Sequence, residues 1–249
     1  MPSIPKNHPR YLSLKTREQI ATGVENGIVH TTGLIAHGRG EAFDYLLGET
    51  TTTDAEHATK TAAAALLTAE NPVISINGNV VVLSSRDCVS LAKKIPAKLE
   101  VNLFHRTSQR MDKIITLLEE AGAPIVYGKN GDAHIPGLDH DRGICDKAGI
   151  FSSDVILVPL EDGDRCKALK KMGKTVVTID LNPLSRTSQT ADITIVDNLI
   201  RTIPNLCKWV DEMKNLDVNT LQDLVKEWNN SENLHHVKQY MAKRLNSLA

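Results

Sequence analysis

From residue 71 onward, short runs rich in β-branched residues alternate with longer runs of helical periodicity, and few folds accommodate this alternation. Strands separated by helices of about ten to fifteen residues form βαβ units, with parallel strands and helices on both faces of the sheet. We therefore predict an α/β fold with a Rossmann-like, doubly wound, mainly parallel six-stranded sheet. The predicted strands are residues 72–77, 98–104, 124–127, 154–159, 174–180 and 193–196, with helices at residues 85–94, 107–121 and 163–172.

Helical patterns flank this core at both ends of the chain. We expect a single domain over residues 1–249, with an N-terminal helical flank (1–70), an α/β core (71–197) and a C-terminal helical flank (198–249). The flanks are expected to pack on the sheet or to form a dimer surface. Their predicted helices are residues 13–26, 40–47 and 54–69, with three more within residues 198–247.

The composition argues against several classes of partner. The 29 Lys and Arg residues balance 30 Asp and Glu residues, so no basic field attracts a nucleic acid or an anionic membrane. No apolar run reaches the roughly 18 to 20 residues that span a bilayer. The N-terminus has no signal-peptide core and the four cysteines form no CxxC pair, so we expect reduced thiols in a cytoplasmic protein.

Two polar loops follow the first and fourth predicted strands. In a sheet of order 3-2-1-4-5-6, ligands bind beyond the carboxyl ends of these two strands, where the order reverses. Asn77-Gly78-Asn79 offers two amides, and Glu161-Asp162-Gly163-Asp164 offers three carboxylates around a glycine. The pair suits a phosphate on one side and Mg²⁺ or an amine on the other. A tight turn and a helix cap without a ligand fit the same residues equally well.

The fifth predicted strand also ends in a polar segment. Asp180-Leu181-Asn182 closes the strand, and a proline-containing loop then presents Arg186 and Thr187. A carboxylate and an amide followed by an arginine favour a nucleotide clamp in which the guanidinium binds phosphate, with a capped loop as the alternative. Arg106, at the end of the second predicted strand, is placed to reach a ligand at the same edge, although lone arginines are mostly solvated.

A third polar segment, His37-Gly38-Arg39-Gly40-Glu41, places a cation between two glycines just before a predicted helix. Backbone N–H groups at a helix start and the Arg39 side chain would bind one anion together, so we interpret the segment as a phosphate site, with a surface turn as the alternative. The sequence contains neither GxxxxGK[ST] nor GxGxxG, and no nucleophile motif such as GxSxG. We therefore predict catalysis by positioning and electrostatics, without a dedicated protein cluster for a metal.

Several long blocks, spread over nearly the whole chain, follow the order of one known family. They are residues 4–11, 33–49, 76–79, 100–104, 159–165, 179–187 and 194–198. On these blocks the chain resembles the archaeal phosphopantothenate synthetase family, the 4-phosphopantoate:β-alanine ligases of coenzyme A biosynthesis. The resemblance implies that ATP with Mg²⁺ activates 4-phosphopantoate as an acyl-adenylate, releasing pyrophosphate. It further implies that β-alanine displaces AMP to give 4′-phosphopantothenate, and that the protein is a homodimer.

The resemblance also implies a set of ATP contacts, namely Arg17, Arg39, Asp180, Leu181, Asn182, Arg186, Thr187, Asp197 and Asn198. Arg39 would stabilise phosphate charge, and Asp180 and Asn182 would bind the adenosine. As hypotheses, we assign the two substrates of the condensation to His37, Asn77, Asn79, Arg106 and Glu161. We assign the catalytic step to Arg39, Asp162 and Asp164, the aspartates as contacts for Mg²⁺ or for the ammonium group of β-alanine.

Two other functions fit the same polar segments. An ADP-forming ligase or phosphotransferase would use a phosphate site and an acidic loop to form an acyl phosphate, and its nucleotide product distinguishes it from an adenylate-forming ligase. A non-catalytic nucleotide sensor would use the same pocket to bind ATP or coenzyme A and to bias a partner.

Overall fold

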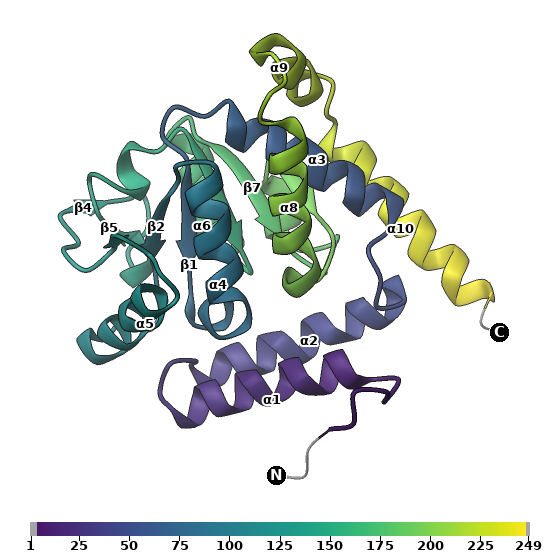
Figure 1. The fold of residues 1–249 in the computed structure, drawn as a ribbon, viewed down its shortest axis with the longest axis horizontal. Coiled ribbons are helices and arrows are strands. Elements are labelled where there is room, and N and C mark those ends of the chain that lie inside the picture. Colours follow the sequence, from purple (N-terminus) through teal and green to yellow (C-terminus); the bar gives the residue numbers. More distant parts are fainter. Residues whose placement is uncertain (1–3, 248–249) are drawn as a thin grey trace.

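A computed structural model describes residues 4–247 and contains a six-stranded, all-parallel sheet in the order β3-β2-β1-β6-β7-β8 (Figure 1). The predicted fold class is confirmed, and the strand order is the one assumed for locating the ligand-binding edge. The order reverses between β1 and β6, which pair in parallel at Ile74 and Leu157. The strands are β1 (Val73–Ile76), β2 (Lys98–Val101), β3 (Val126–Tyr127), β6 (Val155–Pro159), β7 (Thr175–Ile179) and β8 (Ile193–Ile195).

Helices lie on both sides of the sheet because alternate side chains of each strand point to opposite faces. Ile74 and Leu157 belong to one apolar cluster, together with residues of α3, α4, α5 and α8. Val73 and Ile156 belong to a second cluster with residues of α6. The helices of this core are α3 (Thr53–Leu67), α4 (Gly78–Lys94), α5 (Ser108–Glu120), α6 (Gly163–Lys171), α7 (Arg186–Thr190) and α8 (Leu199–Met213).

An insertion of residues 128–153 covers part of the second face and forms a small antiparallel sheet that was not predicted. Its strands are β4 (Ala133–His134) and β5 (Ile144–Cys145), with the 3-10 turns η1 (Asp141–Gly143) and η2 (Ile150–Ser152). The fully buried Glu100 of β2 anchors the insertion, because its carboxylate accepts hydrogen bonds from the backbone N–H groups of Asp146 and Ile150 at 2.9 and 2.6 Å. Burial raises the pKa of Glu100 to about 7.

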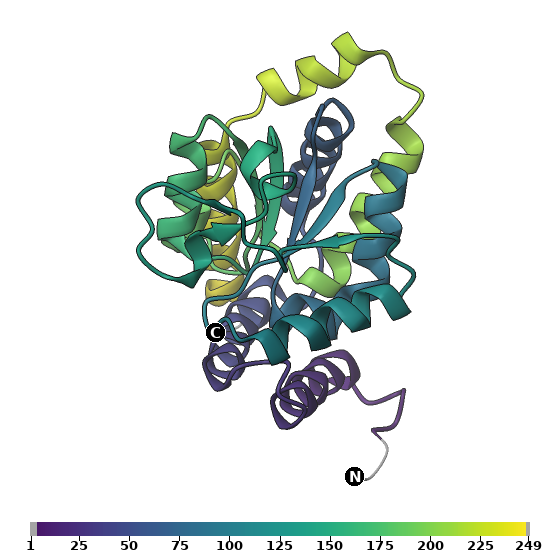
Figure 2. The same ribbon diagram turned by 90° about the vertical axis from the view of Figure 1, so that its left-hand side faces the viewer.

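Two N-terminal helices, α1 (Tyr11–Glu25) and α2 (Thr31–Leu47), lie side by side at one end of the sheet (Figure 1, Figure 2). The prediction that the second helix begins at residue 40 is wrong. The backbone enters the helix already after His30, whose side chain accepts a hydrogen bond from the Thr32 N–H. Gly33 then lets α2 approach α4, since a Cβ at this position would lie 2.4 Å from Oδ1 of Asn79.

Helix α4, which follows β1, also begins earlier than predicted, at Gly78 in place of residue 85. Asn77 caps it, because its Oδ1 accepts hydrogen bonds from the N–H groups of Asn79 and Val80 at 3.0 and 3.1 Å. A kink at Ser84, with φ −149° and ψ 31°, separates this first turn from the helical periodicity that the sequence shows. The consecutive valines Val80–Val82 before the kink show no such periodicity, and the helix start was therefore missed.

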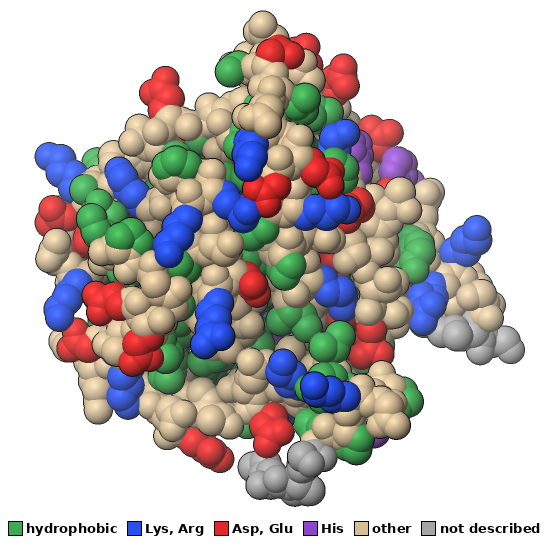
Figure 3. Space-filling model, viewed as in Figure 1, with side chains coloured by type: hydrophobic (Ala, Val, Ile, Leu, Met, Phe, Trp, Pro, Cys, Tyr) green, Lys and Arg blue, Asp and Glu red, His purple; other side chains and the backbone are tan. Residues whose placement is uncertain are grey.

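In the described chain up to residue 247, three helices follow the sheet, as the sequence predicts. They are α8, α9 (Val218–Lys226) and α10 (Asn230–Ser247). Figure 2 places α9 at the end of the molecule opposite α1 and α2. Positive and negative side chains are interspersed over the face seen in Figure 3. Within residues 4–247, no helix combines the length and apolar character that crossing a membrane requires.

Two glycines in left-handed backbone conformation provide a matched test of the fold. A Cβ at Gly128 (φ +106°) would lie 2.2 Å from the carbonyl oxygen of Val101, whereas a Cβ at Gly137 (φ +80°) would meet nothing within 4 Å. Both changes to Ala incur about 1 to 2 kcal/mol for the left-handed conformation, and Gly128→Ala adds roughly 1 to 3 kcal/mol of overpacking. Urea denaturation should therefore show a clearly larger loss for Gly128→Ala, and equal losses would contradict the clash.

Candidate functional site

A cavity of about 450 Å³ lies between α2 and the carboxyl ends of β1, β6 and β7. This is the edge at which the reversal of strand order places ligands. Both polar and apolar groups line it. The lining residues are Ser13, Thr16, Ala36, His37, Arg39, Gly40, Glu41, Phe43, Asp44, Asn79, Leu83, Leu160, Glu161, Asp162, Gly163, Asp180, Leu181, Asn182, Ser185, Arg186, Thr187, Asn198 and Leu199.

The floor of the cavity is built on a buried carboxylate between two buried arginines. Glu161, which follows β6, pairs with Nη1 of Arg165 and, at 3.2 Å, with Nη2 of Arg142. All three side chains are at most 8% exposed. Burial raises the pKa of Glu161, and the two guanidinium groups oppose that rise. Glu161 is thus already partnered from within the protein.

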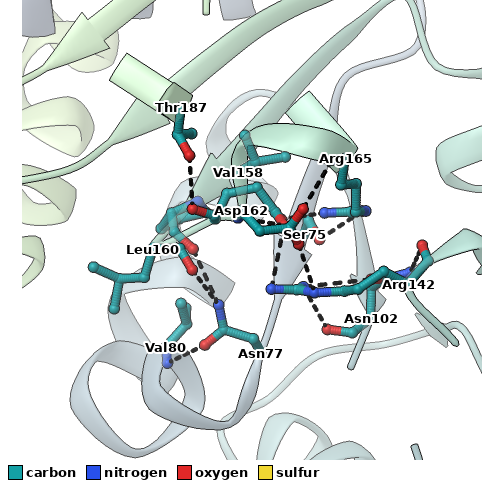
Figure 4. A network of polar contacts seen from close by, with 12 residues as sticks. Ser75, Asn77, Val80, Asn102, Arg142, Val158, Leu160, Asp162, Arg165 and Thr187 are labelled. Carbon is teal, nitrogen blue, oxygen red and sulfur yellow. Dashed lines mark hydrogen bonds and ion pairs between the residues drawn. The ribbon is translucent and has the colours of Figure 1, made fainter. Parts of the chain in front are cut away.

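Arg142 comes from the insertion, so this network joins the insertion to the sheet (Figure 4). Its guanidinium donates to the backbone oxygen of Asn102 at 3.1 Å, and the Asn102 amide donates back to the Arg142 carbonyl at 3.2 Å. On the other side, Arg165 donates to Oγ of Ser75 in β1 at 3.2 Å. The network fixes the loop after β6 relative to three separate segments.

Asp162 both caps α6 and faces the cavity. Its Oδ1 accepts a hydrogen bond from the Arg165 N–H at 2.8 Å, and its Oδ2 lies 3.4 Å from Nε of Arg142. This Oδ2 is enclosed and has no hydrogen-bond partner among the described residues. Burial opposes ionisation, but the contact with Glu161 and the Arg142 charge outweigh it and lower the pKa of Asp162. The carboxylate is therefore charged at neutral pH.

The loop after β7 holds a second carboxylate at the cavity wall. Asp180 accepts a hydrogen bond from the Asn182 N–H at 2.9 Å and another from the Ser185 hydroxyl. Burial raises the pKa of Asp180, and these hydrogen bonds and the nearby Arg39 charge oppose the rise. Thr187 donates to the Glu161 carbonyl at 2.8 Å, which ties this loop to the one after β6.

Arg39 reaches the cavity from α2 and forms no ion pair within residues 4–247. The backbone part of the predicted phosphate site is wrong, however. Residues 37–41 lie in the middle of α2, where backbone N–H groups bond to preceding carbonyls and cannot bind a ligand. The anion-binding capacity of this segment therefore rests on the side chain of Arg39.

Glu41, one turn beyond His37, is held by groups of α1 and α2. Arg17 binds both carboxylate oxygens at 2.7 and 2.9 Å, and the Tyr45 hydroxyl donates to Oε1 at 2.7 Å. Burial opposes ionisation, yet the hydrogen bonds from Tyr45 and Arg17 lower the pKa of Glu41. Arg17 thus lies next to the cavity with its charge directed at Glu41.

The wall formed by α8 contains a further buried ion pair. Asp44 of α2 binds Nη2 of Arg201 at 2.6 Å and the side-chain amide of Asn198 at 2.8 Å. Asp197 accepts from Nε of Arg201 at 2.8 Å and from the Thr51 hydroxyl at 2.6 Å. This pairing connects the end of α2 to the start of α8.

Most of the residues predicted for the site meet in this one cavity, and five do not line it. Asn77 uses its side chain as the α4 cap and as a donor to the Pro159 and Leu160 carbonyls at 3.1 and 3.2 Å. Arg106 donates to the Gly128 and Lys129 carbonyls. The other three are Arg17, Asp164 and Asp197. Asp164 pairs with Arg186 at the rim of the cavity.

Sequence reasoning missed much of the apolar and small polar lining. Leu83, Leu160 and Leu199 carry no chemical signal, and Ser13 and Thr16 lie on α1, far from the loops that the sheet topology singled out. Ser185 was adjacent to a predicted clamp, and its position as the α7 cap was a detectable signal. No group of three or more His, Cys, Asp or Glu side chains suited to a metal ion occurs in the described chain.

Comparison with known proteins matches residues 54–244 to a family described as phosphopantothenate/pantothenate synthetase. Over its whole length the chain is 52% identical to a 4-phosphopantoate–β-alanine ligase of Methanosarcina mazei, covering 98% of that protein. It is 51% identical to a protein of the same description from Thermococcus kodakarensis and 50% to one from Thermococcus onnurineus, covering all of this chain and 96% of each relative.

The buried and the exposed arginine pairs should differ sharply in their contribution to stability. Arg165→Met leaves a buried Glu161 with one partner fewer and should lower the free energy of unfolding by about 3 kcal/mol. Arg186→Met removes a pair whose side chains are 71% and 61% exposed and should change it by less than about 0.5 kcal/mol. Chemical denaturation of both variants measures the difference, and a small effect at Arg165 would argue against its central position.

Proposed function

The chain belongs to the phosphopantothenate/pantothenate synthetase family, and we propose that the cavity described above is where it joins 4-phosphopantoate to β-alanine. The enzyme is an amide-forming ligase that makes 4′-phosphopantothenate for coenzyme A biosynthesis. One geometric observation supports the location: Arg39, which forms no ion pair in the described part of the chain, faces Asp180 across a cavity at the reversal of strand order.

A carboxylate does not condense with an amine in water unless one of its oxygens becomes part of a leaving group. A ligase of this family implies a nucleotide substrate, and we propose ATP as that substrate. The carboxylate of 4-phosphopantoate attacks the α-phosphate, pyrophosphate leaves, and the resulting acyl-adenylate then reacts with the amine to release AMP. The contribution of the protein is to align the reactants and to stabilise charge on phosphorus.

We assign the two ends of ATP to opposite parts of the cavity. Asp180 and Asn182, held rigidly by the loop after β7, bind the adenosine, and Leu181 and Asn198 complete that part. Arg39 binds the phosphates and stabilises charge at the reacting phosphorus. Arg186 and Thr187 contact phosphate at the rim. Arg17 also contacts phosphate once its guanidinium releases Glu41. Asp197 contributes indirectly, because it holds Arg201 behind the cavity wall.

The remaining predicted residues divide into contacts and positioning groups. His37 and Asn79 line the cavity and are proposed to contact 4-phosphopantoate or β-alanine. Asn77 and Arg106 act indirectly, by fixing the strand ends on which the contacts stand. Glu161 is neutralised by Arg142 and Arg165, so its proposed role is to place Asp162 correctly.

The donor set beside the phosphates fits one Mg²⁺ ion. Mg²⁺ is commonly held by one or two carboxylates together with the substrate phosphates, and it keeps several water ligands. Asp162 is ionised and lines the cavity, which makes it the carboxylate proposed to hold the ion. Bound there, Mg²⁺ would offset triphosphate charge. Asp164 is proposed to orient Arg186, its ion-pair partner.

We further propose that the enzyme is a cytoplasmic homodimer. Leu34, Ile35 and Tyr45 of α2 are 36%, 72% and 40% exposed, an unusual concentration of apolar side chains for a solvated helix. The four cysteines are free and largely buried, which suits a reducing compartment.

Whether ATP is converted to AMP or to ADP tests the proposed reaction. A substitution of Arg39 tests the location of the site. Purified enzyme with ATP, Mg²⁺, 4-phosphopantoate and β-alanine should release AMP and pyrophosphate together with phosphopantothenate. Arg39→Met should reduce pyrophosphate release by about 10² to 10³. Arg86→Met, at an exposed arginine of α4 outside the cavity, serves as the control. Release of ADP would replace the adenylate with an acyl phosphate, and an active Arg39→Met variant would refute the assignment of Arg39.

The two aspartates of the loop after β6 should give different phenotypes. Asp162→Asn keeps the helix cap but removes the charge, so the Mg²⁺ concentration for half-maximal rate should rise about tenfold. Asp164→Asn releases Arg186 and should raise the KM for ATP while leaving the Mg²⁺ requirement unchanged. Titrations of Mg²⁺ at saturating ATP measure both effects, and identical behaviour of the two variants would argue against separate roles.

A further inference from the structure

The amine substrate must lose a proton inside the cavity before it can react. At neutral pH an aliphatic amine is an ammonium ion, since such groups have a pKa near 10. Its nitrogen has no lone pair until one proton leaves. When the C–N bond then forms, the bond from carbon to the phosphate oxygen breaks, and the phosphate takes that electron pair without needing a proton. The second proton leaves the positively charged nitrogen of the adduct to water.

We propose that His37 accepts the first of these protons, from the ammonium group of β-alanine. This inference rests on the proposed function and adds an acid–base role that the conversion of 4-phosphopantoate and β-alanine requires. His37 lies on the α2 wall, one residue from Gly38 and two from Arg39. It is the single imidazole in the cavity lining within the described chain.

The hydrogen-bonding state of His37 favours this role. Its Nε2 is enclosed and has no hydrogen-bond partner among the described residues, and no hydrogen bond to its Nδ1 is found there either. A neutral imidazole carries one N–H group and one lone pair, and among the described residues no protein group uses either of them. By contrast, His30 at the start of the same helix is occupied as the N-cap.

Apart from Asp162, which is proposed to hold Mg²⁺, the carboxylates that line the cavity are occupied in ways that His37 is not. Glu41 is held by Arg17 and Tyr45, and Asp44 is held by Arg201. Across the cavity, Glu161 lies between two arginines and Asp180 accepts hydrogen bonds from its own loop. The guanidinium groups and hydrogen-bond donors of the protein thus occupy the lone pairs with which these carboxylates would accept a proton from a ligand.

The charges around His37 allow it to work as a base at neutral pH. Burial is the main cause that lowers the pKa of His37, and Arg17 of α1 lowers it further, while Glu41 and Asp44 of α2 oppose the shift. The ring is therefore neutral at pH 7 and can accept a proton. The same two carboxylates then offset the imidazolium charge. The other charged groups lining the cavity are Arg39, Glu161, Asp162, Asp180 and Arg186.

Two amines of different basicity separate this role from a purely structural one. Hydroxylamine is unprotonated at neutral pH and needs no base to expose its lone pair, whereas β-alanine does. With ATP, Mg²⁺ and 4-phosphopantoate present, His37→Asn should form the β-alanine product about 10²-fold more slowly than the wild type. Its loss of hydroxamate formation from hydroxylamine should be at least tenfold smaller than its loss with β-alanine, because hydroxylamine needs no base. His30→Asn, which keeps a good helix cap on the same helix, is the control and should match wild type in both assays.

The pH profile supplies a second measurement. The wild-type rate with β-alanine should fall on the acid side as His37 becomes protonated, at a pH below the ordinary histidine pKa of about 6.5. The His37→Asn profile should lack this limb. Equal losses with β-alanine and hydroxylamine, or a wild-type rate with β-alanine, would overturn the proposal. ADP production by the wild type would overturn only the adenylate route, because hydroxylamine also traps acyl phosphates and the comparison of amines keeps its meaning.

Discussion

The pairing of Glu161 with Arg165 and Arg142 is the interaction on which the arrangement of the cavity depends. It joins the loop after β6 to β1, to the end of β2 through Asn102, and to the insertion that carries Arg142. Such a buried network contributes little net stability compared with apolar packing, but it severely penalises any arrangement in which one charge loses its partner. Its effect is therefore to select one position for Asp162 and for the loops that surround it.

The same principle recurs around the cavity: carboxylates at the wall are neutralised by arginines that stand behind them. Ion pairs join Arg17 to Glu41, Arg201 to Asp44 and Arg142 to Glu161. With these acids compensated, Arg39, which forms no ion pair in the described part of the chain, is left to bind phosphate. The chain has almost equal numbers of acidic and basic residues, so this capacity comes from the placement of charges and not from net charge.

The sequence was sufficient for the sheet and for the edge that carries the cavity, because strand periodicity and the βαβ rule are local signals. It located Asp180 and Asn182 as candidates for the same reason, whereas Arg39 was selected because it stands between two glycines before a predicted helix. It could not show that residues 37–41 lie inside a helix, since two glycines there argue locally for a loop and the decisive contacts, Gly33 with Asn79 and Asp44 with Arg201, come from distant segments. The partners of Glu161 were likewise hidden, because Arg142 lies in an insertion without regular periodicity.

The composition of α2 has a consequence for its local stability. Three of its 17 residues are glycine, each costing a helix interior roughly 1 kcal/mol relative to alanine, and only Asp44 and Leu47 are buried. A helix so constituted opens at a small fraction of the free energy needed to unfold the sheet. Ligands that engage Arg39 and His37 would add their binding energy to helix formation, so the order of this segment becomes linked to substrate occupancy.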